Sequence, residues 1–347
     1  MDRRYVPIAI GSLALAAFVT GGGAWFGSYR AASADKERFA GQVAGESSDR
    51  NPSETAASVP VVEERRDSAP EFTPIKQDGY GSFAVPTAHS AILLDAATGK
   101  TLFEQDADHH RAIASITKLL TAMITVERVK DLDESATVSE NAVYAEGTRV
   151  GCPRSGYCIG ERLHVGERVS VRNLLKAALM NSANDAAIAL AEHVAGSQQA
   201  FVDLMNRRSS ELGLSNTRFC TVSGLELDDP AAEENCYSSA RDVAKIAAYA
   251  LRYDVIWKTM RMEGTKFPSE DGLREHEIFN TDQILGYPNL VGTKTGFTPR
   301  AGYSLMAVAG DPESGKHRLV AVVLDDSARW QSVQSMFSWG FGAFEWR

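Results

Sequence analysis

Three short motifs place serine and lysine side chains where they could carry out nucleophilic catalysis. The first runs from Ser115 to Lys118, inside the apolar segment ASITKLLTAMI. At 100° per residue, Ser115 and Lys118 lie on one flank of a helix and are neighbours. A serine hydroxyl is a poor nucleophile unless a base takes its proton, and lysine is such a base only when neutral. The pair therefore predicts a second cation nearby, which would lower the pKa of Lys118.

The other two motifs supply further polar groups. Ser182-Ala183-Asn184 interrupts two apolar helical patterns, and Lys294-Thr295-Gly296 lies in a strand-like segment. Each motif is weak evidence by itself, because SADK at 33–36 repeats the first pattern and SEN at 139–141 repeats the second. Together they are more specific, since Lys294 is the cation that the first motif requires.

Apolar periodicity predicts the elements that must position these motifs. Residues 89–105 are typical of two strands joined by a tight turn at Thr98-Gly99. Helical patterns fill about 114–253, including one helix before the NSAN break and one after it that stops at Gly196. Strand patterns return at 288–297, 301–310 and 317–326, and an aromatic-rich helix follows at 328–341. This order favours an α+β fold in which helices cover an antiparallel sheet and a helical lobe lies alongside.

The N-terminal composition predicts export. The 22 residues from Val6 to Gly27 carry no charge, follow two arginines, and are long enough to cross a bilayer. Residues 1–29 are thus expected to be a membrane anchor or a signal peptide, with a possible cleavage site at 32–34; the length favours an anchor. Residues 30–84 have the composition of a flexible tether, and a single catalytic domain is expected over 85–347.

Charge and cysteine content narrow the function classes. The net charge is −9, and no basic run is interleaved with aromatics, so nucleic acid is not an expected partner. The four cysteines fall into two close pairs whose spacing fits neither a zinc site nor a redox CxxC motif. Three pairings are possible; we favour the local disulfides Cys152–Cys158 and Cys220–Cys236, which suit an exported protein. No metal or other cofactor is expected.

Residues 85–345 resemble the serine D-alanyl-D-alanine carboxypeptidases, which are low-molecular-mass penicillin-binding proteins of the β-lactamase/transpeptidase-like superfamily. The three motifs occur in the order described for penicillin-binding proteins and class A β-lactamases. Further similar segments are ILLDAATGKTLFEQDAD, ELGLSNTRF, YSSARDVAKIA and RLVAVVLDD. The resemblance implies a five-stranded antiparallel sheet, an all-helical lobe and an active site in the cleft between them. The additional C-terminal β-domain of many relatives is not expected here.

The resemblance also implies catalytic roles. Ser115 would be the acylated nucleophile and Lys118 its base. Ser182 would pass a proton to the leaving amine, and Asn184 would hold the substrate amide and Lys118. Ser223 stands where relatives can carry histidine, and no role is assigned to it.

Substrate-binding roles follow from the third motif. Lys294, Thr295 and Gly296 would line the site of the substrate carboxylate and peptide backbone. The backbone N–H groups of the nucleophile and of Phe297 would hold the oxyanion. Arg329 is a further candidate for binding the substrate carboxylate. Alternatively, Arg329 is a surface arginine at the start of a helix and has no role in binding.

The expected function is hydrolysis of the D-Ala-D-Ala terminus of peptidoglycan peptides on the periplasmic side of the bacterial inner membrane, by an anchored or secreted enzyme. β-Lactams would act as covalent inhibitors. An endopeptidase acting on peptidoglycan cross-links would use the same residues. A β-lactamase is less favoured, because Glu211 and Asn216 are one residue too far apart for the deacylation motif. A non-turnover sensor is also less favoured, since only about five residues precede the apolar run.

Overall fold

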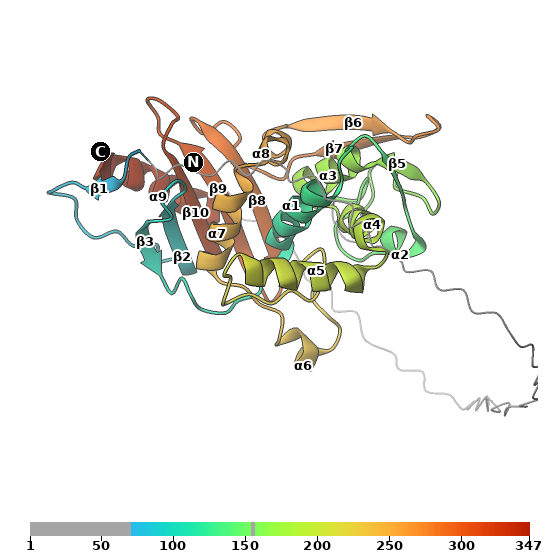
Figure 1. Cartoon of the computed structure of the whole chain (residues 1–347), viewed down its shortest axis with the longest axis horizontal. Helices are drawn as coiled ribbons and strands as arrows, with labels where there is room; N and C mark the ends of the chain where they lie inside the picture. Colours follow the sequence, from blue (N-terminus) through green and yellow to red (C-terminus); the bar gives the residue numbers. More distant parts are fainter. Residues whose placement is uncertain (1–70, 154–156) are drawn as a thin grey trace, which may run out of the picture. The chain divides into compact units, whose positions relative to one another are not determined.

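A five-stranded antiparallel sheet forms the centre of the protein (Figure 1). The computed structural model describes residues 71–153 and 157–347. The sheet has the order β3-β2-β10-β9-β8, and every neighbouring pair is antiparallel. Its strands are β2 (Ala88–Asp95), β3 (Thr101–Gln105), β8 (Leu290–Thr298), β9 (Gly302–Gly310) and β10 (Arg318–Asp326). The predicted fold class and hairpin are confirmed, and β8, which carries the Lys-Thr-Gly motif, is an edge strand.

Alternate residues of the central strands face two separate cores. On β10, Val320 and Val322 pack into the core shared with the helical lobe, whereas Leu319 and Ala321 pack on the opposite face. The C-terminal helix α9 (Arg329–Ala343) covers that second face, and its Phe337 is fully buried there. This alternation is the two-residue period of a strand buried on both sides.

The helices of the lobe begin and end at residues that favour those positions. Ser170 and Ser197 cap the N-termini of α3 and α5 through their side-chain oxygens, and Gly196 ends α4 with a φ of 77°. The two predicted helices around the NSAN break are confirmed as α3 and α4. The helices of the described residues other than α9 are η1 (Ala114–Thr117), α1 (Lys118–Arg128), α2 (Glu140–Val143), α3 (Val171–Met180), α4 (Asn184–Ala195), α5 (Gln198–Glu211), α6 (Pro230–Glu233), α7 (Ala240–Ala250) and α8 (Asp254–Met260).

Three two-stranded sheets were not predicted. They pair β4 (Ser135–Thr137) with β5 (Arg168–Ser170), β6 (Gly264–Pro268) with β7 (Glu275–Phe279), and β1 (Pro74–Lys76) with β11 (Phe344–Trp346). The last pair corrects the C-terminal end of the expected tether, because residues 74–76 form a strand. Phe83 also stacks on Trp339 of α9 at a centroid distance of 5.0 Å. The contacts of β1 and Phe83 join segments that are far apart in sequence, so the periodicity of either segment does not predict them.

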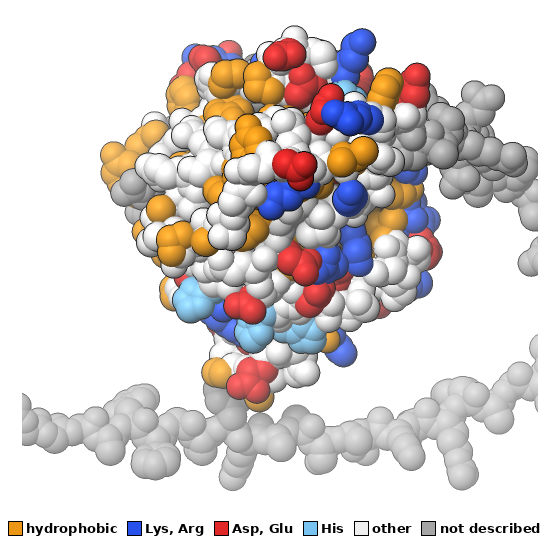
Figure 2. Space-filling model, turned by 90° about the vertical axis from the view of Figure 1, so that its left-hand side faces the viewer, with side chains coloured by type: hydrophobic (Ala, Val, Ile, Leu, Met, Phe, Trp, Pro, Cys, Tyr) orange, Lys and Arg blue, Asp and Glu red, His pale blue; other side chains and the backbone are white. Residues whose placement is uncertain are grey.

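The predicted anchor or signal peptide and most of the predicted tether lie outside the described residues. Within the described ranges, no helix combines the length and apolar character needed to cross a bilayer. Figure 2 shows the side of the molecule with β1 and α9, where basic, acidic and apolar side chains are interspersed.

Candidate active site

Ser115 and Lys118 are in direct contact at the start of the first helix. Ser115 lies in the 3₁₀ turn η1, and Lys118 is the first residue of α1. The Nζ atom of Lys118 is 2.8 Å from Ser115 Oγ, and it donates a second hydrogen bond of 2.8 Å to the carbonyl oxygen of Ser223. Lys118 is fully buried, whereas Ser115 is half-buried. A half-buried hydroxyl is thus held against a fully buried amine.

The segment Val222–Gly224 docks against the turn that carries Ser115. Thr121 of α1 donates a hydrogen bond to the carbonyl of Val222. Gly224 has a φ of 76°, and a Cβ atom at this position would lie 1.9 Å from the carbonyl oxygen of Ala114. Only glycine permits this approach. The close passage brings the Ser223 carbonyl to Lys118.

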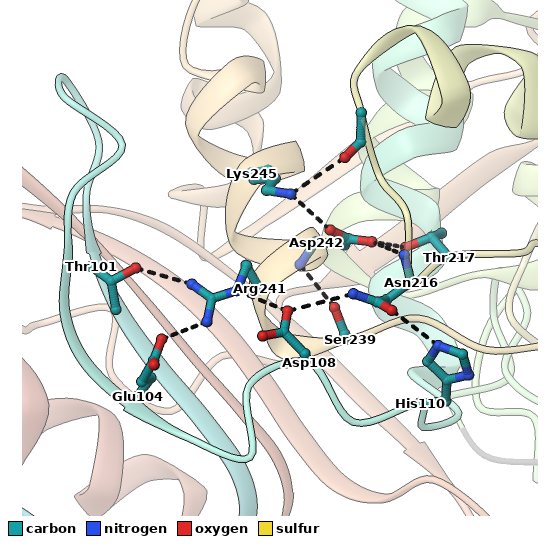
Figure 3. A network of polar contacts seen from close by, with 11 residues as sticks. Thr101, Glu104, Asp108, His110, Asn216, Thr217, Ser239, Arg241, Asp242 and Lys245 are labelled. Atoms are coloured by element: carbon teal, nitrogen blue, oxygen red, sulfur yellow. Dashed lines mark hydrogen bonds and ion pairs between the residues drawn. The ribbon is translucent and has the colours of Figure 1, made fainter.

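A polar network holds the chain that leads into this turn (Figure 3). Arg241 of α7 donates hydrogen bonds to Thr101 and Glu104 of β3 and to Asp108 in the segment before η1. Asn216 contacts both Asp108 and His110. The sheet hairpin, α7 and the approach to Ser115 are therefore connected by hydrogen bonds and ion pairs.

The second motif forms the turn between α3 and α4. Ser182 has a φ of 59°, an uncommon conformation for a residue with a side chain. Asn184 begins α4; its backbone N–H donates to Thr148 O, and its side-chain Nδ2 donates to Glu146 O, both at 2.7 Å. By contrast, Ser139 of the competing SEN pattern caps α2.

The third motif, on β8, meets both of the others. Lys294 Nζ donates a hydrogen bond of 2.9 Å to Ser182 Oγ. A Cβ atom on Gly296 would lie 2.6 Å from the carbonyl oxygen of Ile113, so the strand passes directly against the turn before Ser115. The hydroxyl of Thr295 is 2.9 Å from that of Thr281. The structure thus brings the three motifs to one place, between the edge strand and the helical lobe.

Two buried lysines have strongly altered proton affinities. Burial, followed by the positive charge of Lys294, lowers the pKa of Lys118 well below its usual value, against the opposing effect of the Asp185 carboxylate. Burial and the charge of Arg329 lower the pKa of Lys294 to about 7. The positive charge on Lys294, which that lysine retains at a pH below about 7, thus favours the neutral form of Lys118. This is the charge arrangement that the first motif requires.

The remaining predicted residues surround this centre. Phe297 follows the third motif, is 53% exposed and stacks on Tyr303. Arg329, at the start of α9, donates hydrogen bonds to the carbonyls of Gly296 and Ser304, so it is more than an unattached surface arginine. Both local disulfides, Cys152–Cys158 and Cys220–Cys236, are confirmed.

Sequence reasoning missed several contributors to the site. Ser223 acts through a backbone carbonyl, which has no sequence signature. Thr281 precedes β8 in an irregular segment and belongs to no motif. Asp185 follows Asn184 directly, and its fully buried carboxylate has its pKa raised by burial to about 7. An acidic residue directly before the apolar run 186–191 was the available signal for Asp185.

Comparisons with known proteins show the family of the chain. A family model described as D-alanyl-D-alanine carboxypeptidase matches residues 82–328. A Bacillus subtilis protein named D-alanyl-D-alanine carboxypeptidase DacF is 35% identical over 285 residues, covering 78% of this chain and 66% of the relative. A Pseudomonas aeruginosa protein named D-alanyl-D-alanine endopeptidase is 33% identical over 224 residues, covering 62% of this chain and 65% of the relative. The chain thus spans just under two thirds of the length of these relatives.

A solved structure is also similar. The crystal structure of a D-alanyl-D-alanine carboxypeptidase from Mycobacterium tuberculosis has a TM-score of 0.66 and 28% sequence identity. The match covers 77% of this chain and 96% of that one.

Proposed function

Because the chain belongs to the D-alanyl-D-alanine carboxypeptidase family, we propose that it is a serine DD-carboxypeptidase that releases the terminal D-alanine of peptidoglycan peptides ending in D-Ala-D-Ala. The observation that carries the proposal is the 2.8 Å contact between Ser115 Oγ and the Nζ atom of the buried Lys118. Burial and a neighbouring cation favour the neutral amine, which is the form that can accept the serine proton.

Acylation would begin with attack of Ser115 Oγ on the carbonyl carbon between the two D-alanines. The hydroxyl proton passes to Lys118 Nζ as the C–O bond forms. The backbone N–H groups of Ser115 and Phe297 receive the oxyanion. Contact between β8 at Gly296 and the turn before Ser115 supports this pairing of donors.

The leaving amine needs a proton, and Ser182 is the group proposed to deliver it. Its hydroxyl receives a hydrogen bond from Lys294 Nζ. As the C–N bond breaks, Ser182 passes its proton to the amine of D-alanine and is reprotonated by the proton that Lys118 took from Ser115, so that Lys118 becomes neutral again. Water then attacks the ester on Ser115, its proton is taken by Lys118, and cleavage of the ester regenerates the serine.

Recognition of the substrate's terminal carboxylate would come from β8. Lys294 supplies positive charge, Thr295 a hydroxyl, and Arg329 a second positive charge beside Gly296. Asn184 would bind the amide of the acyl part. Because β8 is an edge strand, the peptide can lie along it.

The same proposal includes the partners and the location. Peptidoglycan peptides are the substrates, and β-lactams acylate Ser115 because they present a reactive amide and a carboxylate in a similar arrangement. The enzyme works outside the cytoplasm, held at the inner membrane or released according to the fate of residues 1–29.

The test is to measure D-alanine release by the purified enzyme from a monomeric acyl-D-Ala-D-Ala peptide and from a cross-linked peptide fragment. We expect release from the monomer and at least about a thousand-fold loss in Ser115→Ala, the scale seen when a catalytic serine is removed. Retained release by Ser115→Ala would refute the assignment. Preferential cleavage of the cross-linked fragment would support the endopeptidase alternative, which the Pseudomonas relative favours.

A further inference from the structure

Residues 146–150 are fastened to the second motif by a set of short hydrogen bonds. The side chain of Asn181 donates to the carbonyl of Arg149 at 3.1 Å. The backbone and side chain of Asn184 donate to Thr148 and Glu146, both at 2.7 Å. These contacts surround Ser182 and occupy most of the carbonyl groups of the segment.

Asn181 and Asn184 donate hydrogen bonds to the segment 146–150, whereas Asp185 accepts one from it. Its carboxylate accepts a hydrogen bond from the backbone N–H of Val150, at 3.0 Å to Oδ2 and 3.2 Å to Oδ1. Oδ1 also accepts from the backbone N–H of Ala186 at 2.8 Å. Asp185 is 2% exposed, although charged groups are rarely buried without a specific partner. The carboxylate thus joins the first turn of α4 to the end of the segment 146–150.

The segment in turn fixes the side chain of Asn184. One N–H of the Asn184 amide is used by the Glu146 carbonyl, which sets the orientation of the amide. The second N–H and the Oδ1 atom are then free for the substrate and Lys118. Gly147 has a φ of 75°, and a Cβ atom at this position would lie 2.8 Å from Asn184 Nδ2. The segment therefore passes beside Asn184 as closely as a glycine permits.

We propose that Asp185 is a positioning residue for the reaction: its buried carboxylate holds the segment 146–150 against the α3–α4 turn, and so holds the Asn184 amide in the orientation that binds substrate. This inference rests on the proposed function, since it assigns Asn184 to the substrate amide. Asp185 itself does not touch the substrate.

Two replacements of Asp185 separate the effect of its hydrogen bond with Val150 from the effect of its charge. Asp185→Asn keeps an acceptor oxygen for the Val150 N–H, whereas Asp185→Ala leaves that buried N–H unpaired. We expect Asp185→Ala to lower kcat/KM for an acyl-D-Ala-D-Ala peptide by roughly ten- to a hundred-fold, the scale of one unpaired buried group. Asp185→Asn should stay within about three-fold of the wild type, because a single acceptor suffices.

Gly147→Ala tests the same contact from the other side. Its added methyl group meets the Asn184 amide without altering Asp185, so it should lower kcat/KM in the same way if it folds. Asp254→Ala is the matched control, because Asp254 also lies in the first turn of a helix but is exposed and paired with Lys258. It should leave kcat/KM unchanged. Thermal unfolding of every variant identifies those that fail to fold.

The outcomes distinguish the inference from the function on which it rests. If the wild type neither releases D-alanine nor reacts with a fluorescent penicillin, the proposed function fails. If the wild type is active and folded Asp185→Ala has wild-type kcat/KM, the positioning role is refuted. It is also refuted if Asp185→Asn loses as much activity as Asp185→Ala, because an acceptor for Val150 would then not be sufficient.

Discussion

At the scale of single residues, the site depends on how one buried positive charge acts on the next. Arg329 lowers the pKa of Lys294, and Lys294 lowers the pKa of Lys118. Burial is the larger cause for both lysines, because a desolvated amine favours its neutral form. Catalysis requires both a neutral Lys118 as base and a charged Lys294 for the substrate carboxylate. This requirement predicts how kcat/KM depends on pH.

For the free enzyme, kcat/KM should rise as Lys118 loses its proton and fall as Lys294 loses its own near pH 7. Arg329→Gln removes the charge that depresses the pKa of Lys294, so that pKa should rise. The alkaline limb of the profile should then move to higher pH by on the order of half a pH unit. Arg329→Lys keeps the charge and should keep the limb in place. A downward movement in Arg329→Gln would contradict the electrostatic account.

At the scale of elements, the active site is a contact between an edge strand and a 3₁₀ turn. β8 brings Lys294 to Ser182 and brings Gly296 against Ile113. The helices α3 and α4 supply the turn between them, and the segment at Gly224 closes the other side of the nucleophile. At Gly296 and Gly224 the approach is close enough to exclude a side chain, so glycines decide the geometry there.

Gly296→Ala tests this contact directly. Its Cβ atom would lie 2.6 Å from the Ile113 carbonyl and would push the turn that carries Ser115 away from β8. Such overpacking costs about 1–3 kcal/mol, so kcat/KM should fall by roughly five- to a hundred-fold. Gly286→Ala is the matched control, because its added methyl group meets open space. Equal activity in the two variants would show that the close approach is not needed.

Much at this scale was predictable from sequence. Strands and helices with regular apolar periods, such as β10 and α3, were found from the pattern together with capping residues. The hairpin β6–β7 was missed because its segments are rich in charged residues. The strand β7 carries the buried His276. The Nε2 atom of His276 lies 2.6 Å from Oε1 of Glu167, a partner more than a hundred residues away in sequence. A pairing of that kind has no local signature.

At the scale of the whole molecule, the two ends of the described fold meet far from the catalytic centre. β1 pairs with β11, and Phe83 stacks on Trp339 of α9. The sequence suggested a tether up to residue 84, because residues 30–84 are rich in Ser, Ala, Glu, Asp, Pro and Gly and show no sustained apolar period. The site was predicted more completely, since each of its motifs is local. Groups that enter from elsewhere, such as the Ser223 carbonyl and Thr281, could be found only from the folded structure.

Because β1 pairs with β11, we expect the removal of β1 to lower the stability of the protein without lowering its activity. Compared with residues 71–347, a fragment of residues 85–347 lacks β1 and Phe83. Loss of one partly buried aromatic corresponds to about 1–2 kcal/mol, so Tm should fall by roughly 2–6 °C. D-Alanine release at low temperature should be unchanged. Phe83→Ala in the longer fragment should reproduce part of the loss of Tm. Equal Tm values for the two fragments would contradict the packing described here.

The central claim is that Ser115 is the nucleophile and that Lys118 activates it. The most direct measurement is mass spectrometry of the protein after reaction with a penicillin, with the adduct mapped by peptide analysis. The account predicts one penicilloyl group on Ser115, no adduct in Ser115→Ala, and acylation slowed by at least about a hundred-fold in Lys118→Met, the scale of general-base catalysis. An adduct on another residue, or wild-type acylation by Lys118→Met, would contradict it.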